Sequence, residues 1–229
     1  MKLLKFAALA LVFTSLCLSV KSQDEDEKEE NKISSSVEVL KEFTGMKENI
    51  PSQLLKISEG LIIIPGMKNA GLVVGGKRGK GIAVVKNADG SWSDPVFVTI
   101  TGGSFGLQAG VQSVDLVLVV NRRSTLEKIG KGDFTLGGQI SATAGPAGRS
   151  STANTDYKLD AEIYSYSRSK GLFAGVSVNG AVIDVDEKAN ERYYNQAVPA
   201  KTIFDKGVTS NKSETQALKK TLNDITTAK

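Results

Sequence analysis

The sequence predicts an α+β fold, a mainly antiparallel, strongly curved or barrel-like β-sheet with several short helices packed against it. Two stretches, residues 96–101 and 107–112, alternate their side chains with a period of two, which is typical of strands that have two different faces. Residues 114–120 are apolar except for Asp115, which predicts a strand covered on both faces. The 23 glycines disfavour an all-helical architecture.

The first part of the chain predicts two helices followed by short strands. Ser35 and Glu38 have the spacing of a capping box and open a helical pattern. Pro51 can begin a second short helix that ends at Gly60. Strands are expected at residues 61–65, 71–76 and 81–86, with a connection at 77–80 and a turn at 87–90.

The second part of the chain continues the strand pattern and ends in helices. Glycines at 102 and 103 predict a tight connection, residues 102–104, between the strands at 96–101 and 107–112. The later expected elements are a short helix at 124–130, strand-like segments at 134–144, 157–163 and 172–185, a helix with an acidic start at 186–194, and a polar helix at 213–227.

The sequence contains a series of short, ordered blocks. They read GG at 75–76, GKG at 79–81, WSDP at 92–95, TGGS at 101–104, GLQAG at 106–110, DLVLV at 115–119, YSYS at 164–167, KGLFAG at 170–175 and NERYY at 190–194. Together these blocks resemble the SYLF domain, a lipid-binding module. The likeness runs from about Ile33 to about Phe204, so we assign residues 33–205 to a SYLF-like lipid-binding domain. Two positions depart from the family. Asn195 stands where the family usually has glycine, and the pair Lys77 and Arg78 is more basic than the resemblance implies.

Residues 1–22 have the pattern of a signal peptide. Lys2 and Lys5 form a positive start, and an uncharged run from Phe6 to Val20 precedes an expected cut before Gln23. A retained membrane anchor and a lipoprotein modified at Cys17 are less favoured alternatives. Cys17 is the only cysteine, so the cleaved chain would have no disulfide. The expected localisation is exported, periplasmic or associated with the cell envelope.

The net charge of +4 is unevenly distributed. Removing the three lysines of residues 1–22 leaves +1, and residues 24–30 alone carry −5, so the rest of the chain carries +6. We expect residues 23–32 to be an acidic, disordered leader. Residues 206–229 are expected to be a polar C-terminal tail or helix outside the family match. The mildly basic domain is compatible with an anionic partner.

The sequence lacks the signatures of several common catalytic and ligand-binding sites. The chain has no histidine, which excludes Ser-His-Asp and Cys-His catalysis and histidine metal ligation. The sequence GGKRGKG at 75–81 lacks the spacing of a phosphate-binding loop, and the acids near Asp184 and Asp186 lack that of a calcium loop. We therefore expect no enzyme activity, no catalytic residues, no cofactor, no metal site and no nucleic-acid partner.

The favoured function is non-enzymatic binding of anionic phospholipid at the cell envelope. The candidate headgroup-binding residues are Lys68, Lys77, Arg78, Lys80, Arg122 and Arg123. Arginine can hold a phosphate with two hydrogen bonds, and lysine supplies a mobile charge. The candidate membrane-contact residues are Val39, Phe43 and Met46.

Alternatives stay open for two of the candidate segments and for the function as a whole. The basic segment can be a solvated turn, and the first helix can pack on the sheet instead of lying on a membrane. The domain can also be a protein-interaction or envelope-scaffold module that binds an envelope protein without recognising a specific lipid. An unrecognised hydrolase with a spatial pair of carboxylates is a further alternative.

Overall fold

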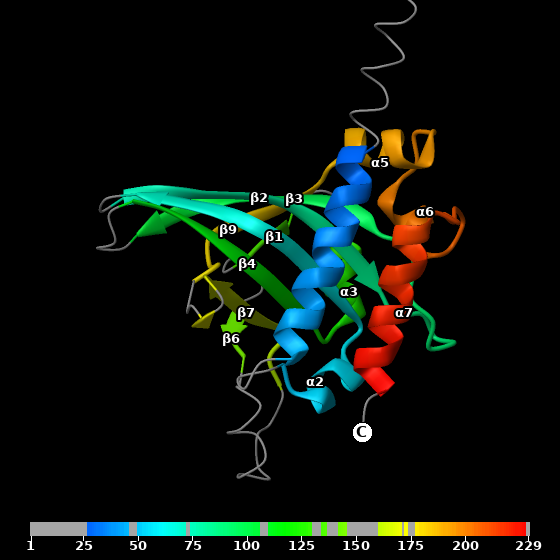
Figure 1. Ribbon diagram of the computed structural model, residues 1–229, viewed down its shortest axis with the longest axis horizontal. Coiled ribbons are helices and arrows are strands. Elements are labelled where there is room, and N and C mark those ends of the chain that lie inside the picture. The colour runs from blue at the N-terminus through cyan, green and yellow to red at the C-terminus, as the bar shows by residue number, and fades with distance from the viewer. Residues whose placement is uncertain are drawn as a thin grey trace, which may run out of the picture.

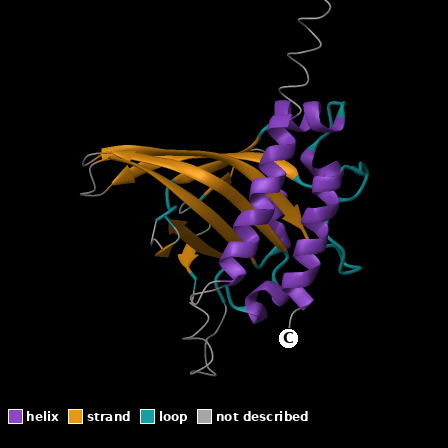
Figure 2. Ribbon diagram, viewed as in Figure 1, coloured by secondary structure: helices purple, strands orange, loops and turns teal. Residues whose placement is uncertain are grey.

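The described part of the chain forms one curved sheet with helices gathered at one end of it (Figures 1 and 2). The computed structural model describes residues 27–45, 50–71, 74–105, 110–129, 134–136, 142–145, 160–170, 172–173 and 177–227. The expected α+β class with a mainly antiparallel, strongly curved sheet is confirmed.

Nine strands are found among these residues. They are β1 (Gly60–Gly71), β2 (Val74–Val85), β3 (Val96–Phe105), β4 (Gly110–Val120), β5 (Phe134–Thr135), β6 (Ala142–Ala144), β7 (Ile163–Ser169), β8 (Leu172–Phe173) and β9 (Ala181–Val185). Their order across the sheet is β5-β9-β3-β2-β1-β4-β7-β6, and β8 pairs with β7. All pairs are antiparallel except β6 with β7.

The helices come from both ends of the chain. They are an N-terminal helix described over residues 27–45, α2 (Ser52–Ile57), α3 (Arg123–Ile129), α5 (Glu187–Tyr194), α6 (Ala200–Phe204) and α7 (Ser213–Thr227). No helix in the described ranges has the length and apolar content needed to cross a membrane. Two expected helices are confirmed as α3 and α5, and the side chain of Asp186 caps α5 by accepting from the backbone N–H of Ala189.

Glycine residues, which have no side chain, allow the central hairpin of β1 and β2 to coil tightly. A Cβ atom on Gly81 would lie 1.9 Å from the carbonyl oxygen of Ile63, which is far inside van der Waals contact. The pairing of β1 also shifts between Ile64 and Met67, as in a β-bulge. Gly66 in this bulge has a φ of +58°, and its N–H donates to Asp115 at 2.8 Å. Bulges and glycines of this kind bend and twist strands.

The two faces of the central strands have different surroundings. One face, which we call the helix face, carries Asp115 on β4 and Arg168 on β7, a register pair. Arg168 forms an ion pair with Glu42 and lies over the ring of Phe43, so the N-terminal helix packs on this face. Figure 1 shows the strands β1, β2 and β3 extending well beyond the helices. We call this extension the sheet tip.

The N-terminal helix begins earlier than the sequence pattern indicated. Residues 27–32, assigned to a disordered leader, are helical, and Ser36 donates to the carbonyl of Lys32 within the helix. Glu29 is only 2% exposed and forms an ion pair with Arg192 at 2.5 Å. The prediction of disorder was wrong here because the acids find cationic partners far away in the sequence.

Two predicted connections are strand interiors. Residues 77–80 lie within β2, which runs without a break from Val74 to Val85, and residues 102–104 lie within β3. The strands β3 and β4 do not form a hairpin, because β2 and β1 lie between them. Glycine is a turn signal in local patterns, but a Cβ atom on Gly79 would lie 2.5 Å from Ile64 and one on Gly102 would lie 2.8 Å from Ala181, so these two glycines relieve crowding in the sheet. The predicted turn at 87–90 is confirmed, with the N–H of Gly90 donating to the carbonyl of Asn87 at 2.8 Å.

The C-terminal helix is part of the fold. The predicted helix at 213–227 is present as α7, but Leu218 and Leu222 are fully buried in the core. The apolar face of α7 packs into the core, so this segment is not a separate polar tail. The expected strand at 134–144 is described in part as β5 and β6, and that at 172–185 as β8 and β9. Residues 157–159 of the third expected segment lie outside the described residues.

Candidate anion-binding surface

Sheet register brings two of the predicted cations together on the exposed sheet tip. Lys68 on β1 and Arg78 on β2 are direct cross-strand partners. Lys68 also pairs with Ser113 on β4, and Arg78 pairs with Thr101 on β3. Because cross-strand partners share a face, these four side chains form a row across four strands. We call these four residues the basic row.

The basic row has no acidic side chain of its own. Lys68 and Arg78 are both exposed, and the Nζ of Lys68 donates to the hydroxyl of Ser113 at 3.2 Å. The guanidinium of Arg78 has no hydrogen bond or ion pair to any other residue that the structure describes. Like charges directly opposite each other weaken a sheet. An anion bound between them would remove this repulsion, and the two flanking hydroxyls could donate to it as well.

Lys80 lies on the same face but its charge is neutralised. Its Nζ forms an ion pair with Asp186 at 2.6 Å. Burial raises the pKa of Asp186, but hydrogen bonds from Lys80 and from the backbone N–H of Ala189 outweigh it, so the pKa lies below its ordinary value. Asp186 is thus held as a carboxylate, and Lys80 helps to fix the start of α5.

Lys77 points to the opposite face of β2. Alternation along the strand separates it from Arg78 and Lys80. Only 5% of Lys77 is exposed, and its Nζ donates to the carbonyl of Ser177 at 2.6 Å. Burial lowers its pKa. Lys77 was predicted to lie with the other cations because residues 77–80 were expected to form a loop. In a loop, side chains do not alternate between two faces.

The predicted pair of arginines lies away from the basic row. Arg122 forms an ion pair with Glu162 at 2.9 Å, and Arg123 forms one with Asp205 at 3.4 Å. Both arginines follow the end of β4, whereas the basic row crosses β4 at Ser113. The six predicted cations therefore do not form one surface.

The predicted membrane-contact residues of the first helix are buried where the structure describes them. Val39 is 4% exposed and Phe43 is fully buried in the core. This arrangement matches the alternative of a helix packed on the sheet, because the apolar face of the helix already covers apolar strand residues. Contact of these side chains with a membrane would require the helix to leave the sheet. Met46 lies outside the described residues.

A family model described as Ysc84, "Las17-binding protein actin regulator", matches residues 101–225. This match covers more than half of the chain and includes α7. The chain belongs to the Ysc84/SYLF family. The resemblance inferred from the sequence blocks is confirmed, but the expected end of the likeness at Phe204 was too early. The family is described by binding and regulation rather than by a catalysed reaction.

Curated relatives of the Ysc84/SYLF family are similar over most of this chain. LAS seventeen-binding protein 3 of Saccharomyces cerevisiae is 36% identical over 187 residues, which are 80% of this chain and 40% of the relative. Protein YSC84 of the same yeast is 37% identical over 163 residues, 70% of this chain and 35% of the relative. Human SH3 domain-containing YSC84-like protein 1 is 34% identical over 176 residues, 74% of this chain and 51% of the relative. The chain thus spans about half or less of the length of these relatives.

Several of the SYLF sequence blocks hold the fold together. Asp94 of the WSDP block is fully buried and accepts from Lys219 on α7 at 2.9 Å. In the NERYY block, Asn190 binds the backbone of Phe97, and the hydroxyl of Tyr194 donates to the carbonyl of Pro95 at 2.7 Å. These contacts join the strand β3 to α5 and α7. The WSDP and NERYY blocks are therefore structural.

No cluster of three or more acids, cysteines or histidines that could hold a metal ion occurs among the residues that the structure describes. Thr101 and Ser113 of the basic row were not among the predicted site residues. They join the basic row only through strand register, for which the sequence carries no local signal.

Proposed function

We propose that this chain binds anionic phospholipid at a membrane surface, with the basic row contacting headgroup phosphates. The observation that carries the proposal is the opposition of Lys68 and Arg78 on an exposed sheet face with no acidic partner. An arginine can grip a phosphate with two hydrogen bonds, while the lysine adds charge beside it. The family relationship agrees with a binding function.

The surface beside the basic row suits a flat partner. The next residues on the same face toward the sheet tip are Ala70, Gly76, Gly103 and Val111. These side chains are small or absent, and Val111 is 73% exposed. A planar bilayer can approach such a surface closely, because the described neighbours of the cations on this face are small. An exposed apolar residue adds contact at the boundary between headgroups and acyl chains.

Vesicle flotation tests this proposal directly. We expect the protein to float with vesicles in which phosphatidylserine replaces part of the phosphatidylcholine, and to float poorly with phosphatidylcholine alone. Rising NaCl should release it, because salt screens exposed charges. Equal recovery with neutral and anionic vesicles would contradict phosphate recognition. Displacement by inorganic phosphate at low concentration would instead assign the row to a free anion.

We also infer a protein-binding role, which the family description favours. The yeast relative is named for binding Las17, and the matching family model is described as an actin regulator. For this chain a protein partner is a proposal of its own. A pull-down in the presence of detergent, which removes lipid, tests this protein-binding role. Loss of every specifically bound protein on detergent treatment would argue against a direct partner.

We also propose that the protein is exported. Residues 1–26 lie outside the described residues, and the described helix starts at residue 27, beyond the expected cut before Gln23. Cleavage there would leave Glu29 and its ion pair with Arg192 in place. The intact mass of the protein from its native source tests it, because a mass that retains residues 1–22 without modification would contradict it.

A further inference from the structure

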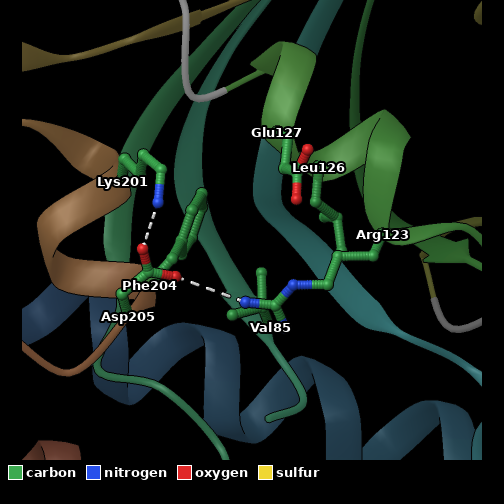
Figure 3. A pocket seen from close by; sticks show the side chains of 7 residues that line it. All are labelled: Val85, Arg123, Leu126, Glu127, Lys201, Phe204 and Asp205. Carbon is green, nitrogen blue, oxygen red and sulfur yellow. Dashed lines mark hydrogen bonds and ion pairs between the residues drawn. The ribbon is translucent and has the colours of Figure 1, made fainter. Parts of the chain in front are cut away.

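A small cavity lies at the end of β2 that is remote from the basic row, between α3 and α6. Its volume is about 150 Å³. Val85, Leu126 and Phe204 supply an apolar, almost fully buried part of the lining. The charged part of the lining consists of Arg123, Glu127, Lys201 and Asp205 (Figure 3). The cavity therefore offers apolar contact inside and charged groups at its rim.

Two exposed ion pairs that share Asp205 lie at the rim of the cavity. Figure 3 shows the carboxylate of Asp205 between the ammonium of Lys201 and the guanidinium of Arg123. The contact from Arg123 to Asp205 is long, at 3.4 Å, and Arg123 also donates to the carbonyl of Lys86 at 3.0 Å. Exposed ion pairs contribute little stability. A ligand with its own carboxylate can therefore compete with Asp205 for Arg123.

An open groove of about 740 Å³ adjoins the cavity and shares Arg123 and Asp205 with it. The segment Lys56–Glu59 and the turn after β2 line the groove. The Nζ of Lys86 donates to the carbonyl of Lys56 at 3.1 Å, and neither ammonium pairs with a carboxylate in the described part of the chain. The buried amide nitrogen of Asn87 likewise has no partner there. The groove thus presents two ammonium groups that lack a carboxylate partner, together with Arg123, beside the carboxylates of Glu59 and Asp205.

We propose that the groove and the cavity together bind an acidic peptide that carries one large apolar side chain. A cavity of about 150 Å³ accommodates a benzene ring, so it fits one phenylalanine or leucine side chain. A long acyl chain is several times larger and does not fit. Peptide carboxylates would pair with Lys56 and Lys86. Ile57, which is 49% exposed, adds apolar contact along the groove.

The two proposed sites lie far enough apart to be occupied together. Arg78 of the basic row and Lys86 of the groove are eight residues apart along β2 and its continuation, which corresponds to about 26 Å of extended strand. A protein with this arrangement can hold an acidic peptide while its sheet tip contacts a membrane. The peptide site is independent of the proposed lipid site, so either can fail alone.

Fluorescence anisotropy tests the peptide site with a labelled pentapeptide in which phenylalanine is flanked on each side by two acidic residues. We expect saturable binding that weakens about tenfold or more when alanine replaces the phenylalanine, because the cavity is then empty. The variant Lys56→Glu/Lys86→Glu should weaken binding to a similar extent. The matched variant Lys68→Glu/Arg78→Glu makes the same change in net charge and should leave peptide affinity unchanged.

Anionic vesicles complete the comparison. The variant Lys56→Glu/Lys86→Glu should still float with vesicles containing phosphatidylserine, whereas Lys68→Glu/Arg78→Glu should not. The peptide proposal is overturned by no saturable binding of the pentapeptide, by equal affinity for the phenylalanine and alanine peptides, or by equal losses in both charge-reversal variants. Displacement of the peptide by sodium octanoate alone would overturn it in favour of a short fatty acid.

Discussion

Replacing Lys219 by alanine should lower the free energy of unfolding by about 3 kcal/mol, because it leaves the carboxylate of Asp94 buried without its cation. Asp94 is fully buried, and its second oxygen accepts from the backbone N–H of Ser210 at 3.1 Å. One hydrogen bond cannot replace the neutralising charge of Lys219. Urea unfolding followed by circular dichroism measures the change.

The neighbouring lysine provides the matched control. Lys220 forms an ion pair with Asp224 on the exposed side of the same helix. Exposed pairs four residues apart contribute roughly 0.3–0.5 kcal/mol, so Lys220→Ala should cost about that amount. Both substitutions place alanine at an interior helix position, so helix propensity changes equally. Equal losses for the two variants would contradict an anchoring role for the contact between Asp94 and Lys219.

Gly81→Ala should destabilise the protein by about 3 kcal/mol or more. The added Cβ would lie 1.9 Å from the carbonyl oxygen of Ile63 and 2.8 Å from a side-chain carbon of Ile64. The first contact is with backbone on the neighbouring strand, so rotation of a side chain cannot relieve it. The hairpin of β1 and β2 would have to open. Thermal unfolding of the purified variant measures this cost.

Gly103→Ala is the control for the same substitution in the same sheet. A Cβ on Gly103 meets nothing within 4 Å. Alanine restricts the unfolded chain more than glycine does, so this variant should be unchanged or more stable by up to about 1 kcal/mol. A Gly81→Ala protein as stable as Gly103→Ala would show that crowding does not shape the coiled hairpin.

Local patterns predicted the elements that depend on local physics. The alternation at 96–101 became part of β3, and the apolar run at 114–120 became the buried end of β4. Asp186 at the start of α5 and the turn ending at Gly90 follow from capping and from a positive φ of 80°. Each of these features involves residues only a few positions apart.

Features that depend on distant residues were not predictable from the sequence. Gly79 in β2 and Gly102 in β3 looked like residues of connections, because only the tertiary structure shows the neighbouring strand atoms that a Cβ atom at either position would meet. The acids of the N-terminal helix looked disordered, because Glu29 meets Arg192 from 163 positions away. For the same reason Lys77 could not be separated from Arg78 before β2 was known to be continuous.

The end of the sheet that the helices cover, which we call the helix end, and the sheet tip have different roles. The helix end carries the buried contacts that stabilise the fold, including Asp94 with Lys219 and Tyr194 with Pro95. The sheet tip carries the exposed cations Lys68 and Arg78, whose mutual repulsion across the strands weakens the sheet. Removing charge from the tip should therefore weaken lipid binding and leave the unfolding transition unchanged or slightly raised.

The most direct measurement is the affinity of Lys68→Ala/Arg78→Ala for vesicles containing phosphatidylserine. Each cation near an anionic surface contributes about 1 kcal/mol, so the double variant should bind about 30-fold more weakly and with a weaker salt dependence. The control Lys128→Ala/Lys188→Ala removes two exposed charges on α3 and α5 and should bind nearly as well as the parent protein. Equal affinities for the two double variants would contradict lipid recognition by the basic row.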